Sequence, residues 1–177
     1  AEFDKFRSLV CATGIASGND RRTKALAYPA CVSTAVSGGC SGDGSGVLLT
    51  SQVASSSNSA PVLSLLAPGD LIMSSVPPGT TCDNPPDAGF CNFQGTSMAA
   101  PHVAGAWAIL KQRVPIASVA TVLGALASTG VSILDSKSGI SKPRIRINDA
   151  LQKIGNGGCN SPPPTFGQIY SQRLYLS

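Results

Sequence analysis

The eleven residues from Gly95 to Gly105 contain the strongest candidate for chemistry, a serine at the start of an apolar helix. They read Gly-Thr-Ser-Met-Ala-Ala-Pro-His-Val-Ala-Gly. Ser97 is expected in the first helical turn, where unpaired N–H groups and the positive end of the helix dipole favour developing negative charge. A serine at a helix start is more often an N-cap. On these residues alone, a catalytic nucleophile and an N-cap are both open.

A long helix has to hold Ser97 in place. From Ser97 to Arg113 the chain is almost entirely small or apolar, which predicts a helix that is buried on every side, and Pro115 ends it. Ser118 is expected to cap a second helix that ends at Gly130. A last helix is predicted over 149–154. These helices would form the layer behind the candidate nucleophile.

The strands predicted upstream suit a parallel sheet. Val10 to Ser17 is small and apolar and runs into Gly18-Asn19-Asp20, which is typical of a buried strand that ends in a turn. Further short strands are expected over 47–53, 62–66 and 71–75. The sequence therefore predicts an α/β chain in which Asn19 follows a strand end.

The string around Ser97 resembles the nucleophile signature of the subtilisin-like serine proteases, the subtilases. Four other segments resemble this family in its own order; they are Ala16-Ser17-Gly18-Asn19, Tyr28-Pro29-Ala30, Leu66-Ala67-Pro68-Gly69 and Arg144 to Leu151. The resemblance covers roughly residues 1–154. It implies a three-layer α/β fold with a parallel sheet, of which this chain would be the C-terminal half of the catalytic domain.

The resemblance also implies roles for single residues. Ser97 matches the nucleophile of a serine endopeptidase, and Asn19 matches the side chain that would hold the oxyanion together with the Ser97 N–H group. For Asn19 alone, an ordinary turn residue is the other interpretation. Ser17, Gly18, Gly95 and Thr96 would line the substrate. Polypeptide substrates are the implied partners, with a propeptide as a further candidate.

The chain departs from the family in its triad. A serine needs a base and an acid that orients the base. His102 is the one histidine, and it lies about 140° around the helix from Ser97, so a packed core residue is expected. The family's Asp-Ser/Thr-Gly and His-Gly-Thr motifs are absent. We therefore expect the chain alone to be inactive, with the missing N-terminal half as its partner.

Two other functional classes stay open beside the protease. One is a pseudo-protease or binding module that keeps the fold without the triad, and the other is one half of a split two-chain enzyme. An α/β-hydrolase is excluded because no histidine follows position 102. No cofactor is expected. Structural Ca²⁺ is common in the family, but no convincing cluster of oxygen ligands or metal-type cysteine spacing stands in this chain.

Composition bounds the remaining classes. The chain has 177 residues, 12% charged residues and a net charge of +4 without a basic run, which argues against nucleic-acid binding. No apolar stretch reaches the ~18 residues of a membrane span. The sequence begins at Ala1 without a signal peptide, as at a processed end or an interior point. We predict one domain over 1–154 and a linker or tail over 155–177.

Six cysteines in a weakly charged chain favour an oxidising compartment, so we expect an extracellular protein. Six cysteines allow 15 pairings. Cys82 with Cys91, and Cys31 with Cys40, each bracket a short loop and are the two pairs we predict. Cys11 is expected to be a free, packed thiol, and Cys159 to pair outside this chain.

Overall fold

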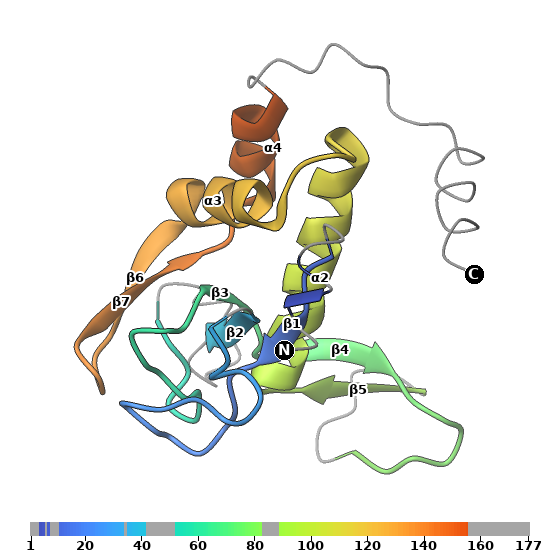
Figure 1. Ribbon diagram of the computed structural model, residues 1–177. Helices are drawn as coiled ribbons and strands as arrows, with labels where there is room; N and C mark the ends of the chain where they lie inside the picture. The colour runs from blue at the N-terminus through green and yellow to red at the C-terminus, as the bar shows by residue number, and fades with distance from the viewer. Residues whose placement is uncertain are drawn as a thin grey trace.

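The structure is a computed structural model, and it describes residues 4–5, 7, 11–33, 35–41, 52–82 and 89–155. Its strands are β1 (Gly14–Ala16), β2 (Val36–Ser41), β3 (Leu65–Pro68), β4 (Ile72–Ser75), β5 (Phe90–Phe93), β6 (Val131–Asp135) and β7 (Ile140–Arg144). Its helices are α2 (Thr96–Arg113), α3 (Val119–Thr129) and α4 (Ile147–Gly155). The three helices begin within two residues of the predicted starts (Figure 1).

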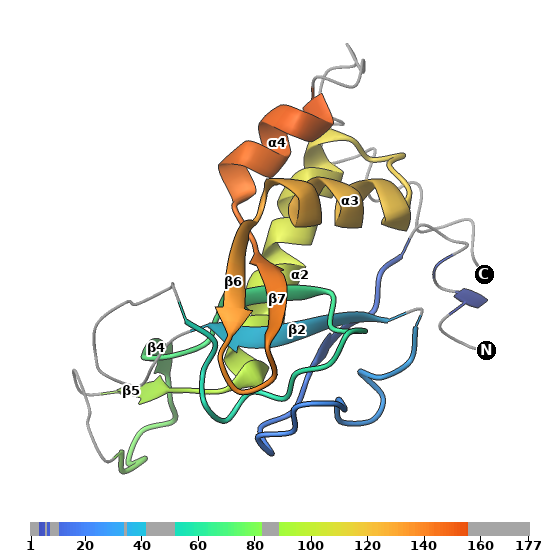
Figure 2. The ribbon, with the colours of Figure 1, turned by 90° about the vertical axis from the view of Figure 1, so that its left-hand side faces the viewer.

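Five of the strands form one sheet in the order β1-β2-β3-β7-β6, and β4 pairs with β5 in a separate antiparallel hairpin. Neighbours from β1 through β3 to β7 are parallel, and only β6 is antiparallel to β7. The predicted α/β class with a parallel sheet is confirmed. In Figures 1 and 2 the β4–β5 hairpin lies beside the start of α2, and α3 and α4 lie near the C-terminal end of α2.

The central strand β3 separates two apolar layers. Leu65 and Leu66 are both fully buried, and adjacent residues of a strand point to opposite faces of the sheet. Leu65 joins a cluster with residues of α2, α3 and α4. Leu66 joins a cluster with Leu26, Leu63 and Ile133. Helices therefore cover one face, and in the described residues irregular segments around 20–33 and 52–63 cover the other.

Helix α2 is buried on one side only, which corrects the expectation of burial all round. Its buried residues are Thr96, Ala99, Val103, Ala106 and Leu110, a spacing that follows one helical face. Pro101, Ala104, Gly105, Ala108 and Ile109 on the remaining surface are exposed. One helix on one sheet face can bury only one side, and an apolar sequence does not say whether a second partner is present.

The first strand is shorter and less buried than predicted. β1 has three residues, and none of them is fully buried, whereas Ser17 just after it is. β1 borders the sheet in the described residues and has β2 as its one neighbour. Cys11 precedes this strand and is a free but exposed thiol, so its predicted packing is wrong.

Several other expectations concern cysteines and the chain end. Cys31 is free and exposed, so the predicted bridge to Cys40 is not formed, whereas Cys82 and Cys91 are bonded as predicted. The pairing of Cys159, residues 47–51 of the strand expected over 47–53 and the tail from residue 156 onward lie outside the described residues, and residues 52–53 form no extended strand. None of the described helices is long and apolar enough to cross a bilayer.

Candidate active site

The serine predicted to act as nucleophile lies at the exposed start of α2. Gly95 precedes the helix and donates its N–H to the carbonyl of Gly69 at 2.7 Å. In the first turn, the N–H groups of Met98 and Ala99 both point to the carbonyl of Gly95. The N–H of Ser97 has no hydrogen-bond partner among the described residues, and its side chain is exposed. Ser97 therefore offers both a hydroxyl and an unused amide donor to solvent.

Asn19 is bound to the residue directly before Ser97. Its Oδ1 atom accepts the N–H of Thr96 at 2.9 Å and the Thr96 hydroxyl at 3.1 Å. These two donors orient the amide, because an NH₂ group in the same position could not accept them. The Nδ2 group of Asn19 makes no hydrogen bond within the described part of the chain. The structure thus brings together the two residues that the sequence predicted as one site.

Thr96 also connects Asn19 with the backbone of the residue before it, Gly18. Its hydroxyl accepts the N–H of Gly18 at 3.2 Å while it donates to Asn19. Thr96 is fully buried. Residues 77 positions apart in sequence are therefore joined through one hydroxyl group.

Two glycines are required by the close approach of these segments. Gly95 has a φ of +132°, and a Cβ atom there would lie 3.1 Å from Nδ2 of Asn19. Gly18 has a φ of +99°, and its Cβ would lie 2.4 Å from Nδ2 of Asn58. Any larger residue would be strained and would also displace a neighbouring amide.

Three of the four residues predicted to line the substrate, Ser17, Gly95 and Thr96, are buried, and Gly18 is half-buried. Ser17 is fully buried, and its hydroxyl donates to the carbonyl of Asn58 at 3.2 Å. Thr96 is likewise buried under Asn19. The Ser17 and Thr96 hydroxyls therefore bond within the protein, and a substrate contact by either residue stays a prediction. The sequence could not reveal this, because burial of these hydroxyls depends on segments distant in the chain.

Asn58 is a residue of this region that the sequence did not single out. It is fully buried and bonded to the segment that carries Asn19. It stands within Ser55-Ser56-Ser57-Asn58-Ser59, where polarity alone predicts a solvated loop. No local signal distinguishes it from its neighbours.

His102 has a structural contact rather than a place beside Ser97. It is half-buried, and its Nδ1 atom lies 2.8 Å from the carbonyl oxygen of Met98, one turn earlier in α2. This agrees with the predicted packed, hydrogen-bonded histidine. A ring engaged with its own helix is not in position to take the proton of Ser97.

The disulfide lies on the hairpin that leads into α2. Cys91 is a buried residue of β5 opposite Ser74 of β4, and it is bonded to Cys82. β5 ends at Phe93, only two residues before Gly95. The bridge therefore ties down the chain directly ahead of the candidate nucleophile.

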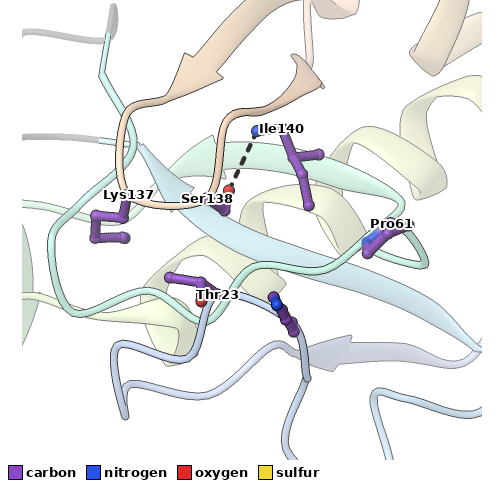
Figure 3. A pocket seen from close by; sticks show the side chains of 6 residues that line it. Thr23, Pro61, Lys137, Ser138 and Ile140 are labelled. Carbon is purple, nitrogen blue, oxygen red and sulfur yellow. Dashed lines mark hydrogen bonds between the residues drawn. The ribbon is translucent and has the colours of Figure 1, made fainter.

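One hollow of about 510 Å³ lies between the 20–24 segment and the β6–β7 turn. Figure 3 shows Thr23, Pro61, Lys137, Ser138 and Ile140 around it, with the Ile140 N–H bonded to the Ser138 hydroxyl. None of its lining residues is a predicted site residue. Within the described ranges, no group of three or more His, Cys, Asp or Glu could hold a metal ion.

Comparison with known proteins places this geometry in context. Residues 7–157 match the Subtilase family. Subtilisin from Bacillus pumilus is 32% identical over 144 residues, which are 81% of this chain and 46% of that protein. Intracellular serine protease from Paenibacillus polymyxa is 38% identical over 104 residues, which are 59% of this chain and 27% of that protein. The chain thus spans less than half the length of these relatives.

Solved structures agree with the sequence comparison. A protease from Pseudoalteromonas arctica superposes with a TM-score of 0.69 and 27% identity, over 86% of this chain and 45% of that one. A Prenylagaramide maturation protease superposes with a TM-score of 0.67, over 85% of this chain and 53% of that one. At 22% identity, the second likeness concerns the fold alone.

Proposed function

The chain belongs to the subtilase family of serine proteases, and from this premise we propose that it is part of a serine endopeptidase that hydrolyses peptide bonds of polypeptides. Ser97 is the proposed nucleophile and Asn19 the proposed oxyanion-binding side chain. One observation carries the proposal. Asn19 is anchored through Oδ1 at 2.9 Å and 3.1 Å to Thr96, the residue directly before Ser97, and neither its Nδ2 group nor the Ser97 N–H has a partner among the described residues.

In the proposed reaction, Ser97 Oγ attacks the carbonyl carbon of the scissile peptide bond as its proton passes to a base. The carbonyl oxygen becomes an oxyanion, which the Ser97 N–H and Asn19 Nδ2 bind. Donors already held in place cost no reorganisation as the charge develops, and this makes them effective in the transition state. The positive end of the α2 dipole adds to the same stabilisation.

The base and its orienting carboxylate are proposed to come from residues outside this sequence, in the missing N-terminal part of the domain. The apolar surface of α2 supports this, because Ala104, Ala108 and Ile109 are exposed in the described chain and would be covered by further elements. Residues 1–154 would then form the C-terminal half of a catalytic domain. We expect residues 1–177 alone to show no protease activity.

The direct test uses the full-length protein that contains this chain. A fluorophosphonate probe is expected to label it once, and Ser97→Ala should abolish both labelling and hydrolysis of a casein substrate. Ser132→Ala is the matched control, because Ser132 is exposed on β6 and belongs to no part of the site. Labelling that survives in Ser97→Ala would refute the assignment of the nucleophile.

Asn19→Ala tests the second half of the proposal. Loss of one oxyanion donor lowers kcat by about 100- to 1,000-fold, a figure that comes from subtilisin itself and is carried over to this chain. The KM should change little, because the oxyanion exists only in the transition state. Unchanged kcat in a folded Asn19→Ala variant would remove Asn19 from the mechanism.

The same full-length protein distinguishes the two alternatives. A folded protein that neither reacts with the probe nor hydrolyses protein substrates would be a pseudo-protease or binding module. A chain that becomes active only when a separately made N-terminal half is added would be half of a split enzyme. Activity in a single continuous chain supports neither of them.

Secretion and processing by a propeptide are further parts of the proposal. The relatives include both an intracellular and an extracellular protease, so the family does not decide the compartment. The Cys82–Cys91 bridge favours an oxidising one. Detection of the mature protein in the culture medium, and not in the cell lysate, would support secretion.

A further inference from the structure

The segment that carries Asn19 has little regular structure of its own. β1 ends at Ala16, and residues 17–22 belong to no helix or strand. Backbone groups in such a segment still need hydrogen-bond partners. A loop that must hold a side chain in one position needs those partners to be rigid. In the described residues more of them come from Asn58, on a distant segment, than from any other residue.

The side chain of Asn58 uses its full hydrogen-bonding capacity on this segment. Its Oδ1 atom accepts the N–H of Asp20 at 2.9 Å and the N–H of Arg22 at 3.0 Å. Its Nδ2 group donates to the carbonyl of Ser17 at 3.1 Å and to Oδ2 of Asp20 at 3.0 Å. An asparagine amide has two acceptor sites and two N–H donors, so all four are occupied.

The backbone of Asn58 binds the same segment. Its N–H donates to the carbonyl of Gly18 at 2.8 Å, and its carbonyl accepts the hydroxyl of Ser17 at 3.2 Å. Gly18 is packed so tightly on this residue that a Cβ there would lie 2.4 Å from Asn58 Nδ2. Residues on both sides of Asn19 are therefore bonded to Asn58, while the Asn19 side chain is left to bind Thr96.

Asn58 is itself held from below by the β6–β7 turn. The Nζ group of Lys137 donates to the carbonyls of Ala54 at 2.9 Å and Ser57 at 3.1 Å. The hydroxyl oxygens of Ser138 and Ser59 lie 3.2 Å apart, within hydrogen-bond distance. The residues flanking Asn58 are thus tied to a hairpin of the main sheet, so Asn58 is a fixed point rather than part of a free loop.

We propose that Asn58 is a positioning residue that holds the Asn19 loop against the N-terminus of α2, an inference that rests on the proposed function. Asn58 is fully buried, so it does not touch substrate and acts only through Asn19. A displacement of about 1 Å in a catalytic group can cost about 100-fold in rate. Loss of Asn58 should therefore lower kcat without weakening substrate binding.

Asn58→Asp is the sharpest variant for a test in the full-length protein. It keeps the size of the side chain and both accepted bonds, but it loses the Nδ2 donor. It also sets a carboxylate beside Oδ2 of Asp20, where the present contact is 3.0 Å. We expect kcat to fall by about 10- to 100-fold with little change in KM. The double variant Asn58→Asp with Asp20→Asn removes the like-charge contact and should recover part of the loss.

Combining Asn58→Asp with Asn19→Ala distinguishes a positioning role of Asn58 from a general role in stability. If Asn58 acts through Asn19, Asn58→Asp should lower kcat by less than about two-fold in the Asn19→Ala background, because residues of one network are not additive. Asn58→Ser, a smaller neutral change, is measured in the same way in case Asn58→Asp does not fold. Circular dichroism checks the fold, and Asn148→Asp at an exposed position of α4 is the control.

Additive losses in the Asn19→Ala background, a raised KM with normal kcat, or normal kcat in folded Asn58 variants would each overturn the inference. If Ser97→Ala and Asn19→Ala behave as proposed while the Asn58 variants do not, this inference alone fails. If Ser97→Ala keeps its activity, the proposed function fails and this inference fails with it.

Discussion

The Oδ1 atom of Asn19 accepts both the backbone N–H and the hydroxyl of Thr96, at 2.9 Å and 3.1 Å. Thr96 is the residue directly before Ser97 and the first residue of α2. The end of one strand and the start of one helix are therefore joined through the Asn19 amide. Its oxygen accepts two hydrogen bonds, and its nitrogen donates none within the described residues. This relationship turns a surface asparagine into a fixed hydrogen-bond donor.

Thr96→Val should lower kcat while Thr96→Ser should not. Valine matches threonine in shape but loses the hydroxyl that accepts from Gly18 and donates to Asn19. The half-buried Gly18 N–H and one acceptor site of Asn19 then lack partners, so Asn19 is held less firmly. We expect about a ten-fold loss in kcat from a shift well below 1 Å. Steady-state kinetics of both variants check this, and equal activity would show that the hydroxyl is dispensable.

Gly95→Ala should impair activity more than stability. A methyl group there would lie 3.1 Å from Asn19 Nδ2 on a backbone with φ of +132°, so Asn19 must move. Gly124→Ala is the matched control, because Gly124 is exposed in α3 and its Cβ would meet nothing within 4 Å. That change should stabilise the protein by about 0.5–1 kcal/mol. Kinetics and thermal unfolding of the pair give the comparison, and normal kcat in Gly95→Ala would contradict it.

The stability of the protein should fall in acid partly through Asp135. Burial raises the pKa of this carboxyl, but the Ser138 hydroxyl, the Lys137 N–H, the Lys137 charge and Ser59 together lower it by more, so its pKa lies below the usual 3.8. The Ser138 hydroxyl donates to Oδ2 at 2.8 Å, and Lys137 donates its N–H to Oδ1 at 3.0 Å.

A carboxyl whose pKa is lower in the folded state contributes stability above its unfolded pKa and loses it as pH falls through the folded pKa. The contribution of Asp135 is therefore complete above about pH 5 and declines below pH 4. Urea unfolding from pH 7 to pH 2.5 measures this, and Asp135→Asn should be less stable at pH 7 with a flatter acid limb. Parallel curves for the two proteins would refute it.

The Cys82–Cys91 bridge should stabilise the hairpin ahead of Ser97. The two cysteines are nine positions apart, and closing a loop of this size contributes about 2–3 kcal/mol on the chain-entropy model. Cys82→Ser with Cys91→Ser should lower the free energy of unfolding by that amount. Cys31→Ser is the control, because Cys31 is free and exposed. Non-reducing peptide mapping that finds Cys82 unpaired would exclude the bridge.

Local signals in the sequence were sufficient for the three helices, whereas the strands β2, β5, β6 and β7 were not predicted. Apolar residues over 97–113, Ser118 before the next helix and Gly130 after it are features of neighbouring residues, and α2 and α3 follow them closely. Ser97 and Asn19 could be singled out as candidates because each stands in a short motif at a helix start or strand end, and their roles stay predictions. Such motifs consist of neighbouring residues, so they can be recognised in the sequence alone.

Only the tertiary structure decided what surrounds these two residues. The hydroxyls of Ser17 and Thr96 are buried, and their partners lie at residues 57–58 and 18–19. Asn58 acts on residues 36 to 41 positions away, and Lys137 on residues 80 and 83 positions away. The sequence determined which residues could do the chemistry, whereas partners so distant in the chain meet only once the sheet has formed, and no pattern among neighbours encodes them.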